Sequence, residues 1–425
     1  MTINPKLGRA LRLTGRITAG TALTVVTLGS ILVAGSIQSM NEAAAEPGDL
    51  PASRVSAPPT EGRSVVAVVL GRTGTDAADA LAPYDVFARS DRFSVYTVAD
   101  STAPRHLNGG LTVRPTFSFA DVASGRAATP DVVVMPAIDD PDGPAEADLR
   151  RWMAQRADAG SHILGVCAGA RVLAAAGVLD GHRATSHWSR IPELERSRPQ
   201  VHWVSKQRWV DDGRITTTAG VTSGIPGALH VMRQLAGDAE ADRVGREVAY
   251  PSWSLDEPTA IPGQQFRLSD VPLAVNMAVP WFKPTLGLAL ANGTNEIDAV
   301  AAIEVYSYSS AARVVPIGSS TSITTAHGLV LATTPHASAS VDRTIGAHGF
   351  EAAFADLAAQ TDEVQTRSTA KMIEYPLPSA RIAHGMPDLR VPALLALAVS
   401  LAALAGLTPL LARVARRRRA ARVDD

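Results

Sequence analysis

The chain has 425 residues and a net charge of -1 at pH 7, with 40 basic and 41 acidic side chains. This length is enough for two or three domains, and the balanced charge provides no overall field that would attract nucleic acid. The chain contains one cysteine, which excludes a disulfide within it.

The first distinctive segment is residues 17–37, an uncharged run that follows four basic side chains between positions 6 and 16. A helix of this length spans about 30 Å, the thickness of a bilayer core. Threonine, glycine and serine dilute the run, so a cleaved secretory signal with a small-residue site at 43–45 stays open beside a membrane anchor. We assign residues 1–44 to this signal or transmembrane segment.

Residues 45–62 are rich in proline, serine and glycine, which predicts a linker. Short apolar runs then alternate with helical stretches. We predict strands at residues 64–70, 93–99, 131–135 and 162–166, and helices near 83–89, 145–158 and 170–176. Continuous apolar runs are typical of strands buried on both faces. Residues 63–255 are therefore predicted to form a three-layer α/β sandwich with a mostly parallel sheet.

The single cysteine, Cys167, lies between a predicted strand and a predicted helix in the segment GVCAGA. A nucleophile on such a sharp turn needs small neighbours, and the helix N-terminus beside it favours a thiolate. The N–H of Ala168 could donate to a developing oxyanion. The alternative also stays open: Cys167 is a small buried hydrophobe, and its glycine neighbours permit close strand–helix packing.

Two segments of the chain resemble each other. TDAADALAPYDVF begins at Thr75 and TNEIDAVAAIEVY begins at Thr294, while DRVGREVAYP and TRSTAKMIEYP end at Pro251 and Pro376. Two matches in the same order indicate a duplicated unit, although chance similarity of alanine-rich helices is the alternative. We assign residues 285–380 to a truncated, degenerate second copy that lacks the cysteine segment, and residues 256–284 to a connector.

A second uncharged run, residues 391–412, precedes six arginines between positions 413 and 422. The positive-inside rule predicts a transmembrane helix here, followed by a basic cytoplasmic tail at 413–425. Because both flanks are basic, we predict a protein of the cell membrane with residues 45–390 outside the cytoplasm.

Taken in order, the segments of the first domain resemble the DJ-1/PfpI (ThiJ/PfpI) superfamily within the class I glutamine-amidotransferase-like fold. The similarity covers residues 63–251 and is strongest to isocyanide hydratases and to the N-terminal part of AraC-type regulators. The matching pieces are VVAVVL, the segment from Asp79 to Phe87, VVVMP ending at Pro136, GVCAGA, and RATSHW from Arg183.

The resemblance implies roles for three side chains. Cys167 matches the elbow cysteine, Asp79 matches an acidic residue that approaches it, and His187 falls where many members have a nearby histidine. A protonated carboxyl can donate a hydrogen bond to a thiolate or act as an acid. The alternatives are a solvated helix cap for Asp79 and a structural histidine beside Trp188 for His187.

The sequence also departs from its relatives. Ala137 and Ile138 stand where many members have two glycines that shape the oxyanion hole. Ala168 follows the cysteine, where PfpI-type proteases have histidine and isocyanide hydratases have a hydroxyl residue. This difference argues against proteolysis and also counts against isocyanide hydration. No helix-turn-helix follows the domain, and the ten histidines show no metal-ligand spacing. We therefore expect no nucleic-acid partner, no metal and no cofactor.

The resulting functional hypothesis is a membrane-anchored, extracytoplasmic enzyme, a cysteine-dependent hydrolase or hydratase of a small molecule. Cys167 would attack, Asp79 would tune it, His187 would assist, and the Ala168 N–H would stabilise negative charge. The alternatives are a non-enzymatic module that binds a small molecule or senses oxidants, and a structural or docking role. The expected partners are a small molecule and the membrane, and the resemblance implies a homodimer.

Overall fold

The computed structural model describes residues 62–377, with gaps at 252, 279, 280 and 282, together with Ser30, Ala34 and residues 50–52. The chain divides into two compact units, and the site discussed below lies in the unit made of Glu42–Leu273 and Lys283–Met386. Within that unit we call residues 62–273 the first lobe and residues 283–377 the second lobe.

The main sheet of the first lobe has seven described strands in the order β10-β11-β7-β6-β1-β2-β5. Neighbouring strands run parallel, except that β10 pairs antiparallel with β11 at one edge. The bounds are β1 Ser64–Val69, β2 Phe93–Ala99, β5 Phe117–Ser118, β6 Val132–Met135, β7 His162–Gly165, β10 Trp209–Asp212 and β11 Ile215–Thr218.

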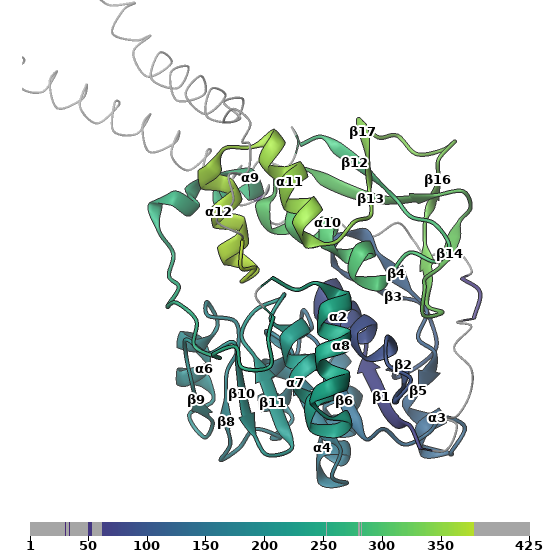
Figure 1. Ribbon diagram of the computed structural model, residues 1–425, viewed down its shortest axis with the longest axis vertical. Coiled ribbons are helices and arrows are strands. Elements are labelled where there is room, and N and C mark those ends of the chain that lie inside the picture. Colours follow the sequence, from purple (N-terminus) through teal and green to yellow (C-terminus); the bar gives the residue numbers. More distant parts are fainter. Residues whose placement is uncertain are drawn as a thin grey trace, which may run out of the picture. The chain divides into compact units, whose positions relative to one another are not determined.

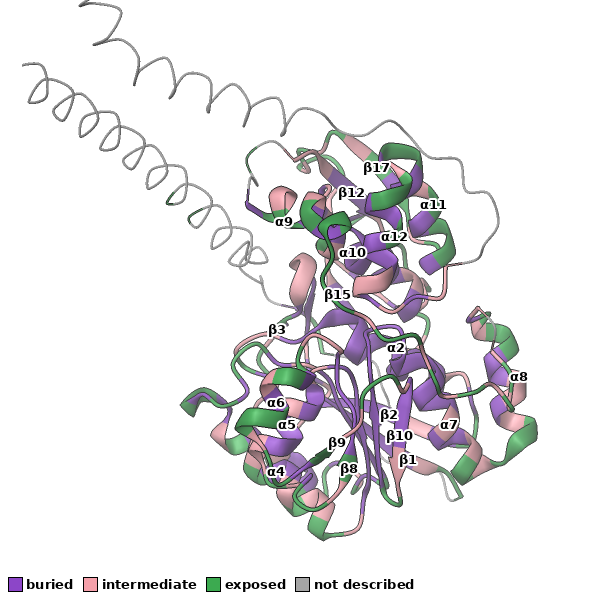
Figure 2. Cartoon of the chain, turned by 90° about the vertical axis from the view of Figure 1, so that its left-hand side faces the viewer, coloured by how far each residue is buried: buried purple, intermediate pink, exposed green. Residues whose placement is uncertain are grey.

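Helices cover both faces of this sheet (Figures 1 and 2). Alternate side chains of β1 point to opposite faces: Val66 and Val68 join the core under one helix layer, and Val65, Ala67 and Val69 join the core under the other. The first layer holds α2 Ala77–Ala88, α7 Gly224–Ala236 and α8 Asp238–Val248, and the second holds α3 Phe119–Ala123, α4 Ala147–Asp158 and α5 Gly169–Ala175. This arrangement confirms the predicted three-layer α/β sandwich.

The second lobe contains a smaller parallel sheet in the order β16-β13-β12-β17. Its strands are β12 Thr285–Ala289, β13 Arg313–Gly318, β16 Thr334–Pro335 and β17 Arg343–Gly346, and its helices are α10 Glu296–Ser309, α11 Phe350–Gln360 and α12 Glu363–Met372. The remaining elements are α6 Ile191–Ser197, α9 Val271–Ala278, the strands β8 Arg183–Ala184 and β9 His202–Trp203, and the short 3-10 turns 108–110, 144–146 and 268–270.

A short antiparallel sheet joins the two lobes. β3 Arg105–His106 and β4 Thr112–Val113 of the first lobe pair with each other, as do β14 Ser322–Thr324 and β15 Val330–Ala332 of the second. The two hairpins meet where Val113 pairs antiparallel with Leu331. Strand pairing therefore joins the two lobes through hairpins that lie 218 positions apart in the chain.

Helices α2 and α10 pack against each other with reciprocal hydrogen bonds. The backbone N–H of Ala78 donates to Glu304 Oε1 at 3.1 Å, and that of Ile297 donates to Asp85 Oδ2 at 2.9 Å. Ala78 and Ile297 are 219 positions apart, as are Asp85 and Glu304. The first turn of each helix thus finds an acceptor on the other helix, which satisfies N–H groups that a helix cannot satisfy itself.

The N-terminus of α2 also contains a proton shared between carboxyl groups. Asp76 caps the helix by accepting the Asp79 N–H at 3.1 Å, and its side chain hydrogen-bonds Glu304 of the second lobe. Burial raises the pKa of Asp76 to about 6 and raises the pKa of Glu304 well above its usual range. Glu304 therefore keeps a proton and donates it to Asp76 across the interface of the lobes.

The predicted strands agree with β1, β2, β6 and β7, and the predicted helices at 145–158 and 170–176 agree with α4 and α5 within a few residues. Helix α2 begins earlier than the predicted 83–89. Asp76 provides the cap, and Pro83 lies inside the helix without ending it. Proline has no N–H, so Pro83 removes one hydrogen bond from the helix interior. The burial of apolar side chains along α2 compensates for this loss of stability.

The predicted membrane helices are wrong as far as the structure tests them. Among the described residues no helix is long and apolar enough to cross a bilayer. The longest of these helices, α10, has 14 residues and spans about 21 Å, less than the bilayer core of about 30 Å. Apart from Ser30 and Ala34, residues 17–37 and 391–412 lie outside the described residues. The predicted membrane anchoring and extracytoplasmic localisation are therefore withdrawn.

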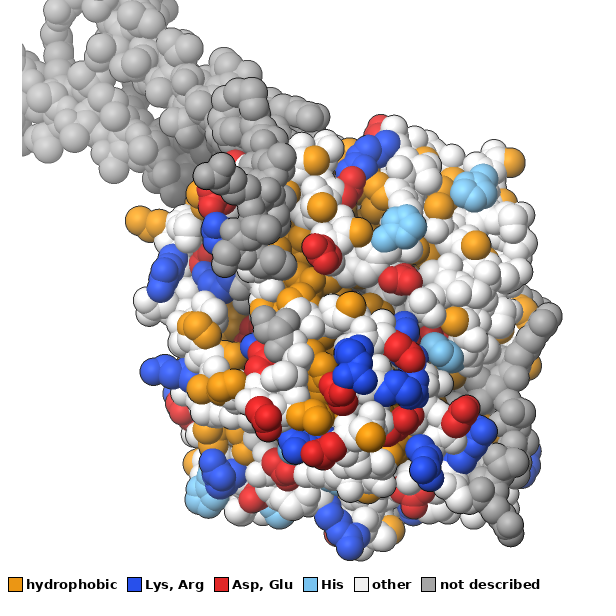
Figure 3. All heavy atoms as spheres, in the orientation of Figure 1, with side chains coloured by type: hydrophobic (Ala, Val, Ile, Leu, Met, Phe, Trp, Pro, Cys, Tyr) orange, Lys and Arg blue, Asp and Glu red, His pale blue; other side chains and the backbone are white. Residues whose placement is uncertain are grey.

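The surface of the first lobe carries mixed charges. Figure 3 shows basic and acidic side chains intermingled on the face that carries α8. Along this helix Arg243 pairs with Glu240 and Glu247, and Arg246 pairs with Asp242, at spacings of three and four residues. Such exposed pairs stabilise a helix only slightly, and on this face they interrupt any field of a single sign.

Removing the Asp85 carboxylate should weaken the contact between the lobes. Asp85→Ala leaves the Ile297 N–H and the Arg89 guanidinium without their acceptor in a buried place. We expect unfolding to become easier by about 2–4 kcal/mol in a urea titration. Asp91→Ala, at an exposed aspartate of the same lobe, serves as the control and should leave the midpoint unchanged. An Asp85→Ala midpoint equal to that of the control would contradict the assigned role.

The shared proton predicts how stability depends on pH. Unfolded Glu304 releases its proton near pH 4.5, whereas the folded protein holds it to a much higher pH, so the folded state binds more protons and loses stability as pH rises above about 4.5. Glu304→Gln keeps a donor toward Asp76 without needing that proton. The variant should therefore become more stable relative to wild type between pH 5 and pH 8 in urea titrations, and the exposed control Glu195→Gln should not.

Candidate functional site

Cys167 lies on the sharp turn between β7 and α5, at the carboxyl end of the central strands. Its φ is +55°, a left-handed conformation that costs a residue with a side chain about 1 kcal/mol or more. Two positions on, a Cβ on Gly169 would stand 2.0 Å from the carbonyl oxygen of Met135. The helix therefore starts directly against β6, and the turn carries the cysteine in the strained geometry of a nucleophile elbow.

Asp79 lies in the first turn of α2 and is completely buried. Its Oδ2 accepts the backbone N–H of Ala137 at 3.1 Å, while Oδ1 receives no N–H or O–H donor from the described residues. Burial, followed by the charges of Asp76 and Glu304, raises the pKa of Asp79 well above its usual range, and its interaction with the Cys167 thiol lowers it in part. Asp79 is thus a protonated acid beside the thiol, and Asp76 is the residue that caps the helix.

The Cys167 thiol is also buried, with 3% of its surface exposed. Burial, followed by the charges of Asp79 and Asp76, raises its pKa well above the ordinary value, whereas the neighbouring backbone N–H of Ala168 partly lowers it. The thiol therefore keeps its proton at neutral pH. The structure brings together Cys167, Asp79 and Ala168, three of the four residues predicted for the site.

His187, the fourth predicted residue, makes its hydrogen bonds elsewhere. Its Nδ1 lies 2.7 Å from Ser189 Oγ, and its Nε2 lies 2.8 Å from the carbonyl oxygen of Met372 in the second lobe. Burial lowers the pKa of the imidazole to about 4, so the ring is neutral, donates from Nε2 to Met372 and accepts at Nδ1. No hydrogen bond of the described residues joins His187 to Cys167 or Asp79.

The second lobe contributes residues to the site that the sequence did not suggest. After α12 the chain turns through Ile373 and Glu374, and Thr222 binds both: its N–H and Oγ1 donate to Ile373 O at 3.1 Å, and Oγ1 also donates to Glu374 O at 3.0 Å. The repeat that ends in YP marked this part of the chain, but it contained no signal that placed the turn beside the cysteine.

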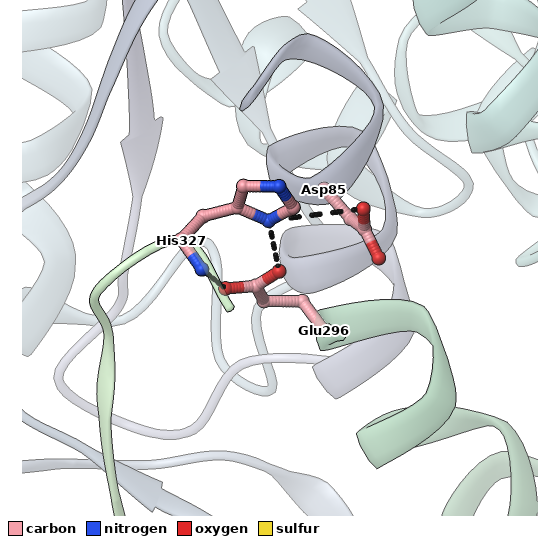
Figure 4. A group of neighbouring side chains, drawn as sticks. All are labelled: Asp85, Glu296 and His327. Carbon is pink, nitrogen blue, oxygen red and sulfur yellow. Dashed lines mark hydrogen bonds and ion pairs between the residues drawn. The ribbon is translucent and has the colours of Figure 1, made fainter. Parts of the chain in front are cut away.

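Asp85, Glu296 and His327 form a second cluster, between the lobes (Figure 4). His327 Nδ1 lies 2.6 Å from Glu296 Oε2 and 3.9 Å from Asp85 Oδ1. Burial lowers the pKa of His327, but the hydrogen bond and the charge of Glu296 outweigh burial, so the pKa is raised overall. Asp85 also binds Arg89 at 2.6 Å, and Glu296 Oε1 accepts from Thr325 and from the His327 N–H. Protonated His327 and Arg89 already provide the positive charge, so the cluster is an ion-pair network.

A cavity of about 480 Å³ lies at the other end of the first lobe's sheet. Ser161 and Ile163 at the start of β7 line it, together with His182, Asp212 and Arg214. Cys167 follows the opposite end of the same strand. Ligands of open α/β sheets bind at the carboxyl ends of the strands, so this cavity is not the candidate site.

Comparison with known proteins finds sequence relatives of the first lobe. Residues 64–234 match the DJ-1/PfpI family. Isonitrile hydratase of Pseudomonas putida is 32% identical over 175 residues, which cover 40% of this chain and 72% of the relative. Protein dj-1beta of Drosophila melanogaster is 31% identical over 156 residues, covering 34% of this chain and 80% of the relative.

Two further similarities are more partial. The HTH-type transcriptional regulator CdhR of Pseudomonas aeruginosa is 27% identical over 158 residues, covering 37% of this chain and 45% of the regulator. Among solved structures, the crystal structure of Drosophila melanogaster DJ-1beta is 24% identical, covers 44% of this chain and 98% of its own, and has a TM-score of 0.39.

The hydrogen bond of His187 to the second lobe should limit access to Cys167. His187→Ala removes the donor to Met372, and a bond of this kind contributes about 1 kcal/mol, so iodoacetamide should alkylate the folded protein about fivefold faster. His202→Ala, at an exposed histidine of the same lobe, is the control and should leave the rate unchanged. Equal rates for wild type and His187→Ala would contradict this positioning role.

Proposed function

The chain belongs to the DJ-1/PfpI family, and from this premise we propose that it is an enzyme that uses Cys167 to hydrate or hydrolyse a small molecule with an electrophilic carbon. The observation that carries the proposal is the combination of a strained elbow cysteine, a buried protonated Asp79 and the Ala168 N–H at the sulfur. Together these groups supply a nucleophile, a proton and a donor for negative charge.

The proposed reaction follows from where the protons lie. When a substrate binds next to the thiol, Asp79 delivers its proton to the substrate carbon. The sulfur bonds to that carbon, and Asp79 takes the proton of Cys167. For an isonitrile, the substrate class that the Pseudomonas putida relative's name states, S–H adds across the terminal carbon and forms a thioimidate. Water then adds to the carbon, the C–S bond breaks, and a formamide and the free thiol result.

The Ala168 N–H supports the charged stages of this reaction. It lowers the pKa of the thiol and so stabilises the thiolate as the proton leaves. Ala137 provides no second free donor, because its N–H already binds Asp79 Oδ2. This bond instead orients the carboxyl group, so that the other oxygen faces away from Ala137. Ala137 therefore contributes to the site by positioning Asp79, although many relatives have glycine at this position.

We further propose that the second lobe is a truncated copy of the first. The support is the reciprocal pairing of α2 with α10, in which Ala78 and Ile297, and Asp85 and Glu304, occupy equivalent positions in the two sequences. The hairpins that pair Val113 with Leu331 obey nearly the same offset. Such reciprocity is what a two-fold relation between two copies produces. The second copy has no cysteine, and its contribution is to surround the site of the first.

A binding module without turnover is the second candidate. It is favoured by the burial of Cys167 and by the use of the Ala137 N–H inside the protein. Oxidant sensing is the weaker form of this candidate, because a buried thiol with a raised pKa reacts slowly. The similarity to the regulator CdhR covers less than half of that protein, so it does not support a regulatory function for this chain.

The enzyme proposal predicts distinct losses for two variants. With alkyl isonitriles as substrates, Cys167→Ser should abolish formamide production, and Asp79→Asn should reduce kcat about 100-fold or more, because the amide cannot deliver a proton. Product formation is followed by NMR, with the exposed Asp91→Asn as control. Saturable isonitrile binding without any formamide would contradict the enzyme and favour the binding module.

A further inference from the structure

Glu374 occupies an unusual place at the end of α12. Its φ is +55°, so its backbone adopts the left-handed conformation that side-chain-bearing residues avoid. The turn is held in the first lobe by Thr222, which donates to the carbonyl oxygens of Ile373 and Glu374, and by His187, which donates to that of Met372. Strain that is held by bonds from another part of the molecule indicates that the position of the side chain matters.

The Glu374 carboxyl group is only half satisfied. Oε2 accepts from Ser223 Oγ at 3.3 Å, while Oε1 is buried and has no hydrogen-bond partner among the described residues. Gly220 makes room for the side chain, because a Cβ at that position would stand 2.6 Å from Glu374 Cβ, Cγ and Cδ. A buried carboxyl oxygen without a donor costs free energy unless a water molecule or a ligand binds it.

Hydrogen bonds of the first lobe connect the turn to the cysteine. Ser186 Oγ donates to Cys167 O at 3.0 Å, and the next residue, His187, donates to Met372 O at 2.8 Å. The charge of Glu374 raises the pKa of the Cys167 thiol, after burial and the charges of Asp79 and Asp76. Burial raises the pKa of Glu374 itself to about 8, which the hydrogen bond from Ser223 and the positive charge of Arg208 partly offset. Near neutral pH such a group can both accept and donate a proton, as acid–base catalysis requires.

His187 does not compete for this role. Both of its nitrogens are engaged, one by Ser189 and the other by Met372 of the same turn that carries Glu374. The first lobe thus uses the histidine that sequence similarity placed near the cysteine to hold the second lobe's turn. Among the described residues, Asp79 and Asp76 are other carboxyl groups whose charges raise the Cys167 pKa, and both lie at the N-terminus of α2. Asp76 caps that helix by accepting the Asp79 N–H, and Asp79 is the acid of the first step.

We propose that Glu374, contributed by the second lobe, is the acid–base residue that activates water to release the product from Cys167. The proposal rests on the proposed function and assigns its second step. Ionised Glu374 takes a proton from water while the water oxygen bonds to the thioimidate carbon and the nitrogen takes the Asp79 proton. The new hydroxyl group then returns a proton to Asp79, the C–S bond breaks, and sulfur takes the proton from Glu374.

The test separates formation of the covalent adduct from its release. Glu374→Gln keeps the size and the bond to Ser223 but cannot take a proton from water. We expect kcat with alkyl isonitriles to fall about 100-fold, while intact mass spectrometry of quenched samples shows the adduct accumulating on Cys167. Glu351→Gln, at an exposed glutamate of the same lobe, is the control and should retain both wild-type turnover and a free thiol.

A second variant protects the test against misfolding. Ser223→Ala leaves the turn in place and removes only the donor to Oε2, so it should lower kcat about threefold to tenfold and shift the pH dependence of kcat. Wild-type turnover by Glu374→Gln, or a loss without adduct, would overturn the role of Glu374 and leave the proposed function standing. A wild-type protein without turnover would overturn the proposed function and this role with it.

Independent of turnover, Glu374→Gln should also lower the pH at which Cys167 becomes reactive toward iodoacetamide, because a negative charge beside the thiol is removed. An unchanged pH profile of alkylation would show that Glu374 does not act on the cysteine, and would overturn the inference by itself. The Glu351→Gln control should follow the wild-type profile.

Discussion

The structure depends on the pairing of α2 with α10, in which each helix completes the other's first turn. The N–H of Ala78 finds its acceptor on Glu304, and the N–H of Ile297 finds its acceptor on Asp85, all within a buried interface. Backbone donors at a helix N-terminus require partners once water is excluded. If the lobes separated, the first turns of α2 and α10 would both lose these hydrogen bonds. The first turn of α2 also carries Asp79, so the position of this acid beside Cys167 depends on the second lobe.

Excess negative charge governs the chemistry of the site. Asp76, Asp79 and Glu304 are buried together at the N-terminus of α2, and the half-buried Glu374 also acts on the thiol. Burial raises the pKa of each of these carboxyl groups above its usual range. Groups of the same sign cannot all ionise in a medium of low polarity, so the site holds protons at neutral pH. A cysteine at a helix N-terminus would ordinarily ionise easily. Here the resting state is a thiol beside a protonated acid, which suits a reaction that begins with protonation of the substrate.

Sequence patterns predicted those parts of the site that depend on neighbouring residues. The apolar runs of β1, β2 and β6 predicted the parallel sheet, because strands buried on both faces leave no polar alternation. GVCAGA predicted the turn at Cys167, because only a glycine at position 169 allows α5 to start against Met135. The burial of Asp79 could not be predicted in this way. An aspartate in the first turn of a helix can equally be a solvated cap or a buried acid. The structure shows that Asp76 is the cap, which leaves Asp79 as the buried acid.

The sequence by itself determined the three-layer sheet and the elbow, since both follow from the period of apolar residues and from local steric limits. The tertiary structure decided what His187 and Glu374 do. His187 meets Met372 across 185 positions of the chain, and Glu374 meets Ser223 across 151. No local pattern encodes such contacts, because they arise only when two separately formed surfaces pack and every buried polar group must find a partner. The packing of the two lobes, rather than any motif, placed a strained glutamate of the second lobe where its charge acts on the cysteine of the first.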